Sequence, residues 1–199
     1  MARNLNRIDK YGLSIAFVIL TFASCGIIRN TDNYRWLVKT TTDADSGSVN
    51  FETIHATTVA EQVAIAMPSL TKESRRTTNE DSVYVLEAFL MGYKTEPDGD
   101  YHLIIQDTKD STTMLAEIPD PDAKWTTHSS RSEQFRSARA AVDKIVGKPS
   151  SSITMLSKPV KLRITGIGFF DPPHFALSHE GSAESGREIH PVLRLEGVE

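Results

Sequence analysis

The 199-residue chain has only one cysteine, Cys25. A lone cysteine excludes an internal disulfide framework, so an ordinary hydrophobic core must stabilise the fold. The sequence also lacks the HExxH and CxxC spacings of zinc sites and the GxSxG turn of serine hydrolases. Gly166-Ile167-Gly168 lies in a predicted strand with no helix after it, which argues against a phosphate-binding loop.

Positive charge is also scarce. Residues 1–24 hold three of the 22 Lys and Arg and one of the 26 Asp and Glu, which leaves a formal charge of −6 on residues 25–199. Phosphate backbones are bound by basic surfaces, so this balance disfavours a nucleic-acid partner.

One long apolar run is present, and it lies near the N-terminus. Three basic residues within the first ten precede the apolar residues 11–24, and small residues lead to Cys25. This is the layout of a secretory signal. The segment FASC resembles the lipobox of bacterial lipoproteins, with Phe22 in the usual place of Leu. The resemblance implies a signal peptide of residues 1–24, lipid on Cys25, and a location in the bacterial cell envelope facing the periplasm or another extracytoplasmic space.

An uncleaved signal anchor is the alternative, because residues 11–28 reach the lower length limit of a membrane-spanning helix. In both cases the basic N-terminus favours staying inside, and the remainder lies outside the cytoplasm. The membrane, through Cys25, is therefore one predicted partner.

The pattern of residues predicts three parts: the signal of residues 1–24, a tether with a short helical segment over 25–80, and a domain over 81–199. Thr57 or Thr58 is placed to cap the short helix, which runs to Met67. A longer helix is predicted over 130–146, with Ser130 and Glu133 as a capping box and Gly147 as its stop. Five segments have strand character: residues 82–93, 100–107, 112–118, 160–170 and 188–195.

Turn signals after the first two strands predict an antiparallel meander, and the long helix falls between strands three and four. That order favours a mainly β (α+β) fold, specifically an OB-fold-like five-stranded antiparallel barrel. An open α+β sheet is the main rival. Gly166 and Gly168 predict a bulge or sharp coiling, and Pro191 predicts an edge or an irregularity in the last strand.

Histidines and carboxylates gather near the predicted strand ends. Asp100 and His102 share one face at the start of the second strand, and the meander brings them beside Glu117 at the end of the third. Imidazole and carboxylate groups can bind a divalent metal or act as general acid and base. Hydrogen-bonded rim residues are the plainer interpretation, and no other cofactor is predicted. The candidates are Asp100, His102, Glu117, Asp171, His174, Glu188 and His190, with His102, Glu117 and His190 as the candidate metal ligands.

Five segments resemble an uncharacterised family of exported bacterial proteins: RWLVKTTTDAD, DGDYHLIIQD, TMLAEIPDP, TGIGFFDPPH and EIHPVLRLE. In that family the loop after the FFD motif continues with His-Gly-Gln, whereas here Phe175 and Ala176 follow His174. The resemblance covers most of residues 25–199 and supports the seven candidates, but it brings no activity with it.

Three functions stay open. The first is a non-enzymatic, envelope-anchored lipoprotein that binds an unknown protein or small ligand. The second is a metal-assisted hydrolase, such as a phosphodiesterase, and the third is a nucleic-acid-binding OB domain. Tight convergence of His102, Glu117 and His190 would favour the hydrolase. Scattered positions of these residues would favour the binding module. An exposed groove of aromatic and arginine side chains would favour the nucleic-acid-binding domain.

Overall fold

The structure is a computed structural model of the full chain, and it describes residues 35–71, 73–171, 181 and 183–198. These residues belong to one compact unit, which spans Thr31–Glu199. The predicted signal of residues 1–24 and the lipidation of Cys25 lie outside the described residues. Within the described ranges, no helix combines the length and the apolar character that crossing a membrane requires.

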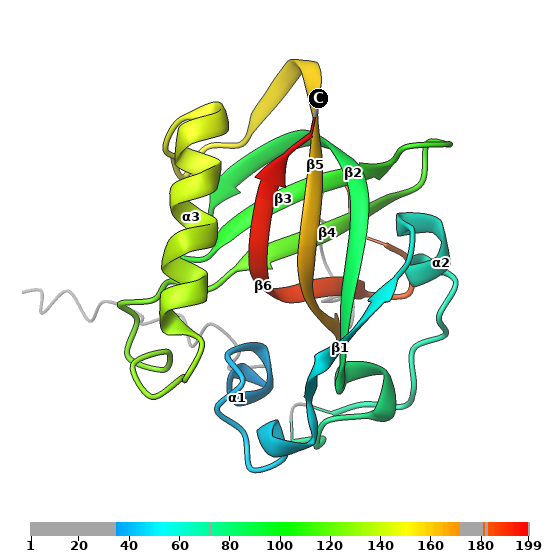
Figure 1. Ribbon diagram of the computed structural model, residues 1–199, viewed down its shortest axis with the longest axis vertical. Helices are drawn as coiled ribbons and strands as arrows, with labels where there is room; N and C mark the ends of the chain where they lie inside the picture. The colour runs from blue at the N-terminus through cyan, green and yellow to red at the C-terminus, as the bar shows by residue number, and fades with distance from the viewer. Residues whose placement is uncertain (1–34, 72, 172–180, 182, 199) are drawn as a thin grey trace, which may run out of the picture. The chain divides into compact units, whose positions relative to one another are not determined.

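The described part of the chain is mainly β, as the sequence predicted (Figure 1). Its strands are β1 (Asn50–Ala56), β2 (Ser82–Thr95), β3 (Tyr101–Asp107), β4 (Thr113–Ile118), β5 (Thr154–Phe170) and β6 (Arg187–Gly197). Its helices are α1 (Trp36–Lys39), α2 (Val59–Val63) and α3 (Ser132–Val146), with 3₁₀ turns η1 (Ser46–Ser48) and η2 (Thr78–Glu80).

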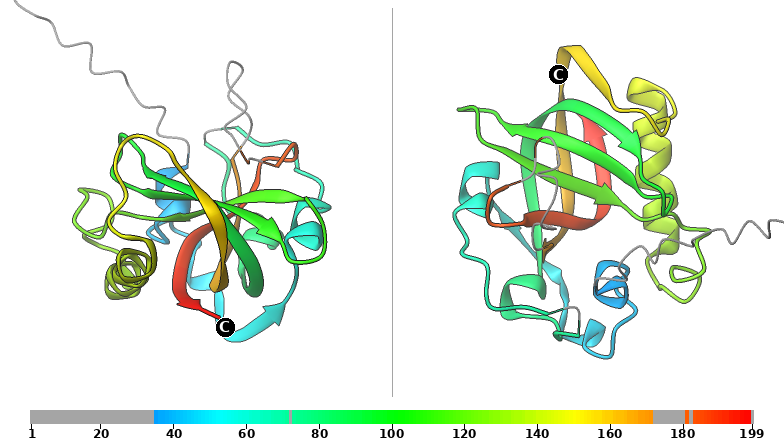
Figure 2. Two further views of the ribbon diagram at one scale, coloured as in Figure 1. Left: turned by 90° about the horizontal axis from the view of Figure 1, so that it is seen from above. Right: turned by 180° about the vertical axis from the view of Figure 1, so that it is seen from behind.

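The strands form one mixed sheet in the order β1-β2-β3-β4-β6-β5, and β5 also pairs with β2. The sheet therefore closes into a ring of β2, β3, β4, β6 and β5, with β1 added outside it. In Figures 1 and 2, β3 and β4 run across the direction of β5. The predicted meander is confirmed, because β2, β3 and β4 pair in antiparallel succession.

The predicted five-stranded antiparallel OB barrel is wrong. β1 pairs with β2 in parallel, and β4 pairs with β6 in parallel. The sequence pattern located β6 but carried no information on its neighbour, because strand pairing is decided by tertiary packing rather than by periodicity. β1 escaped prediction because its residues are exposed except for the half-buried Phe51, so the strand has no apolar alternation.

The two glycines of β5 mark a distortion of the sheet, as predicted. The register between β5 and β6 shifts at Gly166 and again before Gly168. A Cβ atom on Gly166 would overlap the side chain of Ile189, so close contact with β6 requires glycine there. Pro191 lies in the same irregular stretch, although β6 is flanked on both sides by strands and is not an edge.

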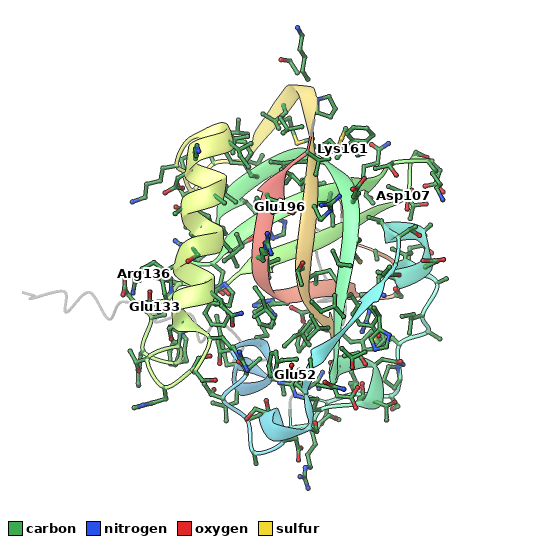
Figure 3. All side chains as sticks on the ribbon, viewed as in Figure 1. Glu52, Asp107, Glu133, Arg136, Lys161 and Glu196 are labelled. Atoms are coloured by element: carbon green, nitrogen blue, oxygen red, sulfur yellow. The ribbon has the colours of Figure 1, made fainter. Side chains whose placement is uncertain are left out.

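Helix α3 covers part of the sheet with an apolar face of Phe135, Ala138 and Val142. Glu133 and Arg136 point away from the sheet, as Figure 3 shows. The helix ends at Gly147, which has a φ of 84° and matches the predicted stop. The predicted capping box of Ser130 and Glu133 does not form, because the helix begins after Arg131 without a side-chain cap.

Helix α2 is shorter than predicted and begins with a true capping box. Thr58 accepts a hydrogen bond from the backbone N–H of Glu61, and the Glu61 carboxylate accepts one from the backbone N–H of Thr58. The helix ends at Val63, four residues before the predicted end at Met67.

Candidate metal centre

Three neighbouring strands place polar side chains on one face of the ring. His102 on β3 is the direct cross-strand partner of Glu117 on β4. On the other side of β4, Ala116 is in register with Ile189 of β6. Because successive residues of paired strands stay side by side, Glu117 and His190 meet one position further along. The sheet register thus brings these side chains together from residues distant in sequence.

The carboxylate of Glu117 lies between the two imidazoles. His102 Nδ1 is 2.7 Å from Glu117 Oε1, and His190 Nδ1 is 3.1 Å from Glu117 Oε2. Both rings are buried, with 2% of His102 and 1% of His190 exposed. The three candidate ligands therefore converge rather than scatter.

Asp100 approaches the same point from the residue before β3. Its Oδ1 accepts a hydrogen bond of 2.9 Å from the backbone N–H of Asp120, which fixes the carboxylate. Its Oδ2 lies 3.5 Å from Nε2 of His190. Only 1% of Asp100 is exposed. One oxygen is thus held by the backbone while the other faces the imidazole.

Four buried polar atoms of this cluster have no hydrogen-bond partner. They are Oδ2 of Asp100, Oε2 of Glu188 and both ring nitrogens of His190. Oε2 of Glu188 is 3.5 Å from Nδ1 of His190. Glu117 is closer to the same nitrogen, but the two groups are not aligned as a hydrogen bond. A buried polar atom left unsatisfied costs about 1–3 kcal/mol, so the cluster is incomplete as it stands.

The charges of the cluster shift its pKa values in opposite directions. Burial alone would raise the pKa of Glu117, but interactions with His102 and His190 hold it well below its usual value. Burial would lower the pKa of His190, yet the carboxylates of Asp100, Glu117 and Glu188 raise it well above the usual value. Burial and the charge of Glu117 raise the pKa of Glu188 to about 7. The site strongly favours positive charge.

Lys39 and Asp171 form the edge of this cluster. Lys39 Nζ, from α1, is 2.7 Å from Oδ2 of Asp171, which follows β5, and it lies 5.3 Å from the ring centre of Phe169. Burial opposes the charge of Lys39, but Asp171, Glu188 and Glu117 raise its pKa above the ordinary value. Lys39 could not be predicted from the sequence, because a lone lysine carries no pattern.

Glu96 is a second residue that the sequence reasoning missed, because it belongs to a predicted turn. Its Oε1 is 3.2 Å from Nδ1 of His102 and 2.8 Å from Nζ of Lys94. Burial would lower the pKa of His102, and Glu117 and Glu96 raise it. This side of the cluster already contains cationic partners for its carboxylates.

Two groups of side chains in the described residues have a spacing that suits a metal ion, and they share Glu117. In each group the ligand atoms lie within 4.8 Å of one another. The group of Glu96, His102 and Glu117 is occupied by ion pairs. The group of Asp100, Glu117 and His190 contains the unsatisfied atoms and is the better fit for a cation.

The two other histidines in the described ranges, His55 and His128, do not belong to this buried centre. His174 lies outside the described residues, and His55 and His128 are exposed. Comparisons with protein-family models, curated proteins and solved structures found no match to this chain. The geometry of the Asp100, Glu117 and His190 cluster therefore carries the functional argument.

Proposed function

We propose that this chain is a metal-binding protein that holds one divalent cation between Asp100, Glu117 and His190. One observation carries the proposal: three buried side chains converge while Oδ2 of Asp100 and both ring nitrogens of His190 lack hydrogen-bond partners. Native proteins pair nearly all buried polar atoms, and a bound cation would satisfy these. It would also balance the excess of carboxylates.

The donor set indicates the class of metal. One imidazole with two carboxylates combines a ligand preferred by zinc with ligands preferred by harder ions such as manganese. Cysteine-based sites are excluded, because Cys25 is the only cysteine. We therefore expect Zn²⁺ or Mn²⁺.

His102 acts on this site through Glu117. Its bond of 2.7 Å to Oε1 of Glu117 leaves the other carboxylate oxygen directed at His190. Partners of this kind orient metal ligands and tune their affinity. His102 is thus a positioning residue in the proposal rather than a ligand.

The test is the metal content of the full chain, purified without chelator and supplied with Zn²⁺ or Mn²⁺. We expect about one ion per chain, lost in His190→Ala and in Glu117→Gln. His128→Ala is the matched control, because His128 is exposed and belongs to neither group of candidate ligands. Absence of metal from the correctly folded wild-type chain would overturn the proposal.

A second candidate function is metal-assisted hydrolysis, which the convergence of His102, Glu117 and His190 favours. Three protein ligands leave a coordination position for water, and a metal activates that water as a nucleophile. The discriminating experiment is hydrolysis of bis(p-nitrophenyl) phosphate by the metal-loaded chain. Activity of the wild-type chain that is lost in His190→Ala would support the hydrolase. A metal-loaded but inactive wild-type chain would contradict the hydrolase and leave only the metal-binding function.

The proposal includes an envelope location, which is supported by the sequence of residues 1–25 and the resemblance to exported bacterial proteins. Attachment through Cys25 predicts incorporation of labelled palmitate, lost in Cys25→Ala. A wild-type chain that takes up no label would contradict lipidation without bearing on the metal centre.

A further inference from the structure

The ring of the sheet is held unevenly. β2 and β5 are paired from Val83 with Ile167 through Tyr93 with Thr154. By contrast, β4 and β6 are paired only at Leu115 with Glu188 and at the next position. Long ladders open rarely, whereas short ones open at lower free energy. The β4–β6 seam is thus the weakest connection of the ring.

The proposed metal ligands lie on both sides of this seam. Glu117 directly follows the last residue of β4 that pairs with β6, and His190 directly follows the last residue of β6 that pairs with β4. Asp100 belongs to the β3 side, since it precedes Tyr101, which pairs with Ile118 of β4. An ion bound by all three would connect the β3 and β4 side directly to β6.

The start of β6 has a separate anchor. The guanidinium of Arg187 donates to Oε1 of Gln62 at 2.8 and 3.0 Å and to the backbone oxygen of Asn79 at 3.0 Å. These bonds tie residue 187 to the α2 and η2 region without reference to β4. Glu188 and Ile189 also pair with Phe169 and Gly168 of β5, so loosening of the seam would separate β4 from β6 while Arg187 stays in place.

Without an ion, three carboxylates at the seam share the single imidazole of His190. Asp100, Glu117 and Glu188 all face His190, and Oε2 of Glu188 and Oδ2 of Asp100 have no donor. Carboxylates that share a buried space without sufficient counter-charge repel one another and are poorly solvated. A divalent cation would remove both costs at once.

We infer that the cation closes the sheet, joining β4 to β6 across the seam so that the ring opens locally when the ion leaves. This inference rests on the proposed metal binding and assigns the ion a structural role. Binding that occurs only in the closed form adds its free energy to the stability of that form. Metal availability would then control the order of β4 and β6.

The experiment is hydrogen exchange of the full chain at increasing free Zn²⁺, with ion binding followed separately by native mass spectrometry. Amides of residues 113–118, 188–190 and 192 should exchange more slowly in proportion to free metal. At a concentration 100 times Kd, the slowing should reach about 100-fold. Amides of residues 83–90 and 160–167, in the long β2–β5 ladder, should not change. In His190→Ala, metal should slow exchange in neither group.

The outcomes separate the two claims. One bound ion with metal-dependent slowing confined to the seam supports the inference. One bound ion with unchanged exchange at residues 113–118, 188–190 and 192 overturns it and leaves the metal site intact. Absence of a bound ion overturns both.

Discussion

Two buried ionic clusters in this molecule differ in how completely their atoms are paired. In one, Arg35 donates to both oxygens of Glu80 at 2.6 Å and to the backbone oxygen of Ser74. Glu80 also accepts from the backbone N–H groups of Phe170 and Thr77. Both side chains of the pair are fully buried. The buried charges of this pair are therefore compensated by hydrogen bonds.

The cluster of Asp100, Glu117 and His190 is also buried but incomplete. Both ring nitrogens of His190 and one oxygen of Asp100 lack partners. The comparison shows that burial of charged groups does not by itself mark a functional site. Unsatisfied atoms within a converged donor set do, because folding alone gives no reason to retain them.

The largest expected effect belongs to the complete cluster. Glu80→Ala leaves Arg35 buried and unpaired, which should destabilise the fold by about 3–5 kcal/mol. Urea unfolding would measure the loss, and added Zn²⁺ should not restore it. Glu87→Ala is the control, because Glu87 pairs with Lys161 and Arg163 at the surface, where ion pairs contribute about 0–1 kcal/mol. An equal loss of unfolding free energy in Glu80→Ala and Glu87→Ala would contradict the distinction between the buried and the surface ion pairs.

Removal of metal comes next and concerns only the incomplete cluster. At a free Zn²⁺ concentration 100 times Kd, the ion should stabilise the wild-type chain by about 2.7 kcal/mol. Chelation should remove this increment, and His190→Ala should show no response to metal. Thermal unfolding with and without chelator measures both. A stabilisation by Zn²⁺ that persists in His190→Ala would place the ion elsewhere.

Replacing the positioning residue should have an intermediate effect. His102→Ala frees Oε1 of Glu117, so we expect metal affinity to fall about 10–100-fold while one ion per chain still binds. Competition with a chromophoric chelator gives the affinity. A loss of all binding would make His102 a ligand, and an unchanged affinity would remove its orienting role.

The last prediction is the pH dependence of the metal-free chain, in which burial and the charge of Glu117 disfavour the ionised form of Glu188. Burial raises the pKa of Glu188 from 4.5 to about 7, so the folded state binds more protons than the unfolded state across that interval. The contribution of Glu188 to the free energy of unfolding should be full below pH 4.5 and be lost as pH rises through 7. Glu188→Gln should flatten the curve of unfolding free energy against pH, and an unaltered slope would contradict the assignment.

The sequence predicted much of the fold because its signals were local. Alternation and turn residues located β2, β3 and β4, and Gly147 marked the end of α3. The parallel pairing of β4 with β6 was beyond its reach, because residues 115 and 188 meet only in the folded chain. The exposed strand β1 had no periodicity to recognise.

The candidate site was also predictable only as far as local sequence signals reach, and not where it depends on tertiary strand pairing. The meander indicated that Asp100, His102 and Glu117 lie on neighbouring strands, whereas the place of His190 depended on the pairing of β6. Lys39 was missed, because its burial beside Asp171 is a tertiary contact. Local patterns identified the groups, and only the closed ring reveals which of their atoms lack partners.

The most direct test of the central claim is anomalous diffraction at the zinc absorption edge, from crystals of the full chain grown with Zn²⁺. We predict one strong peak within coordination distance of Asp100, Glu117 and His190. A well-ordered cluster without a peak, or a peak held only by other side chains, would contradict the account.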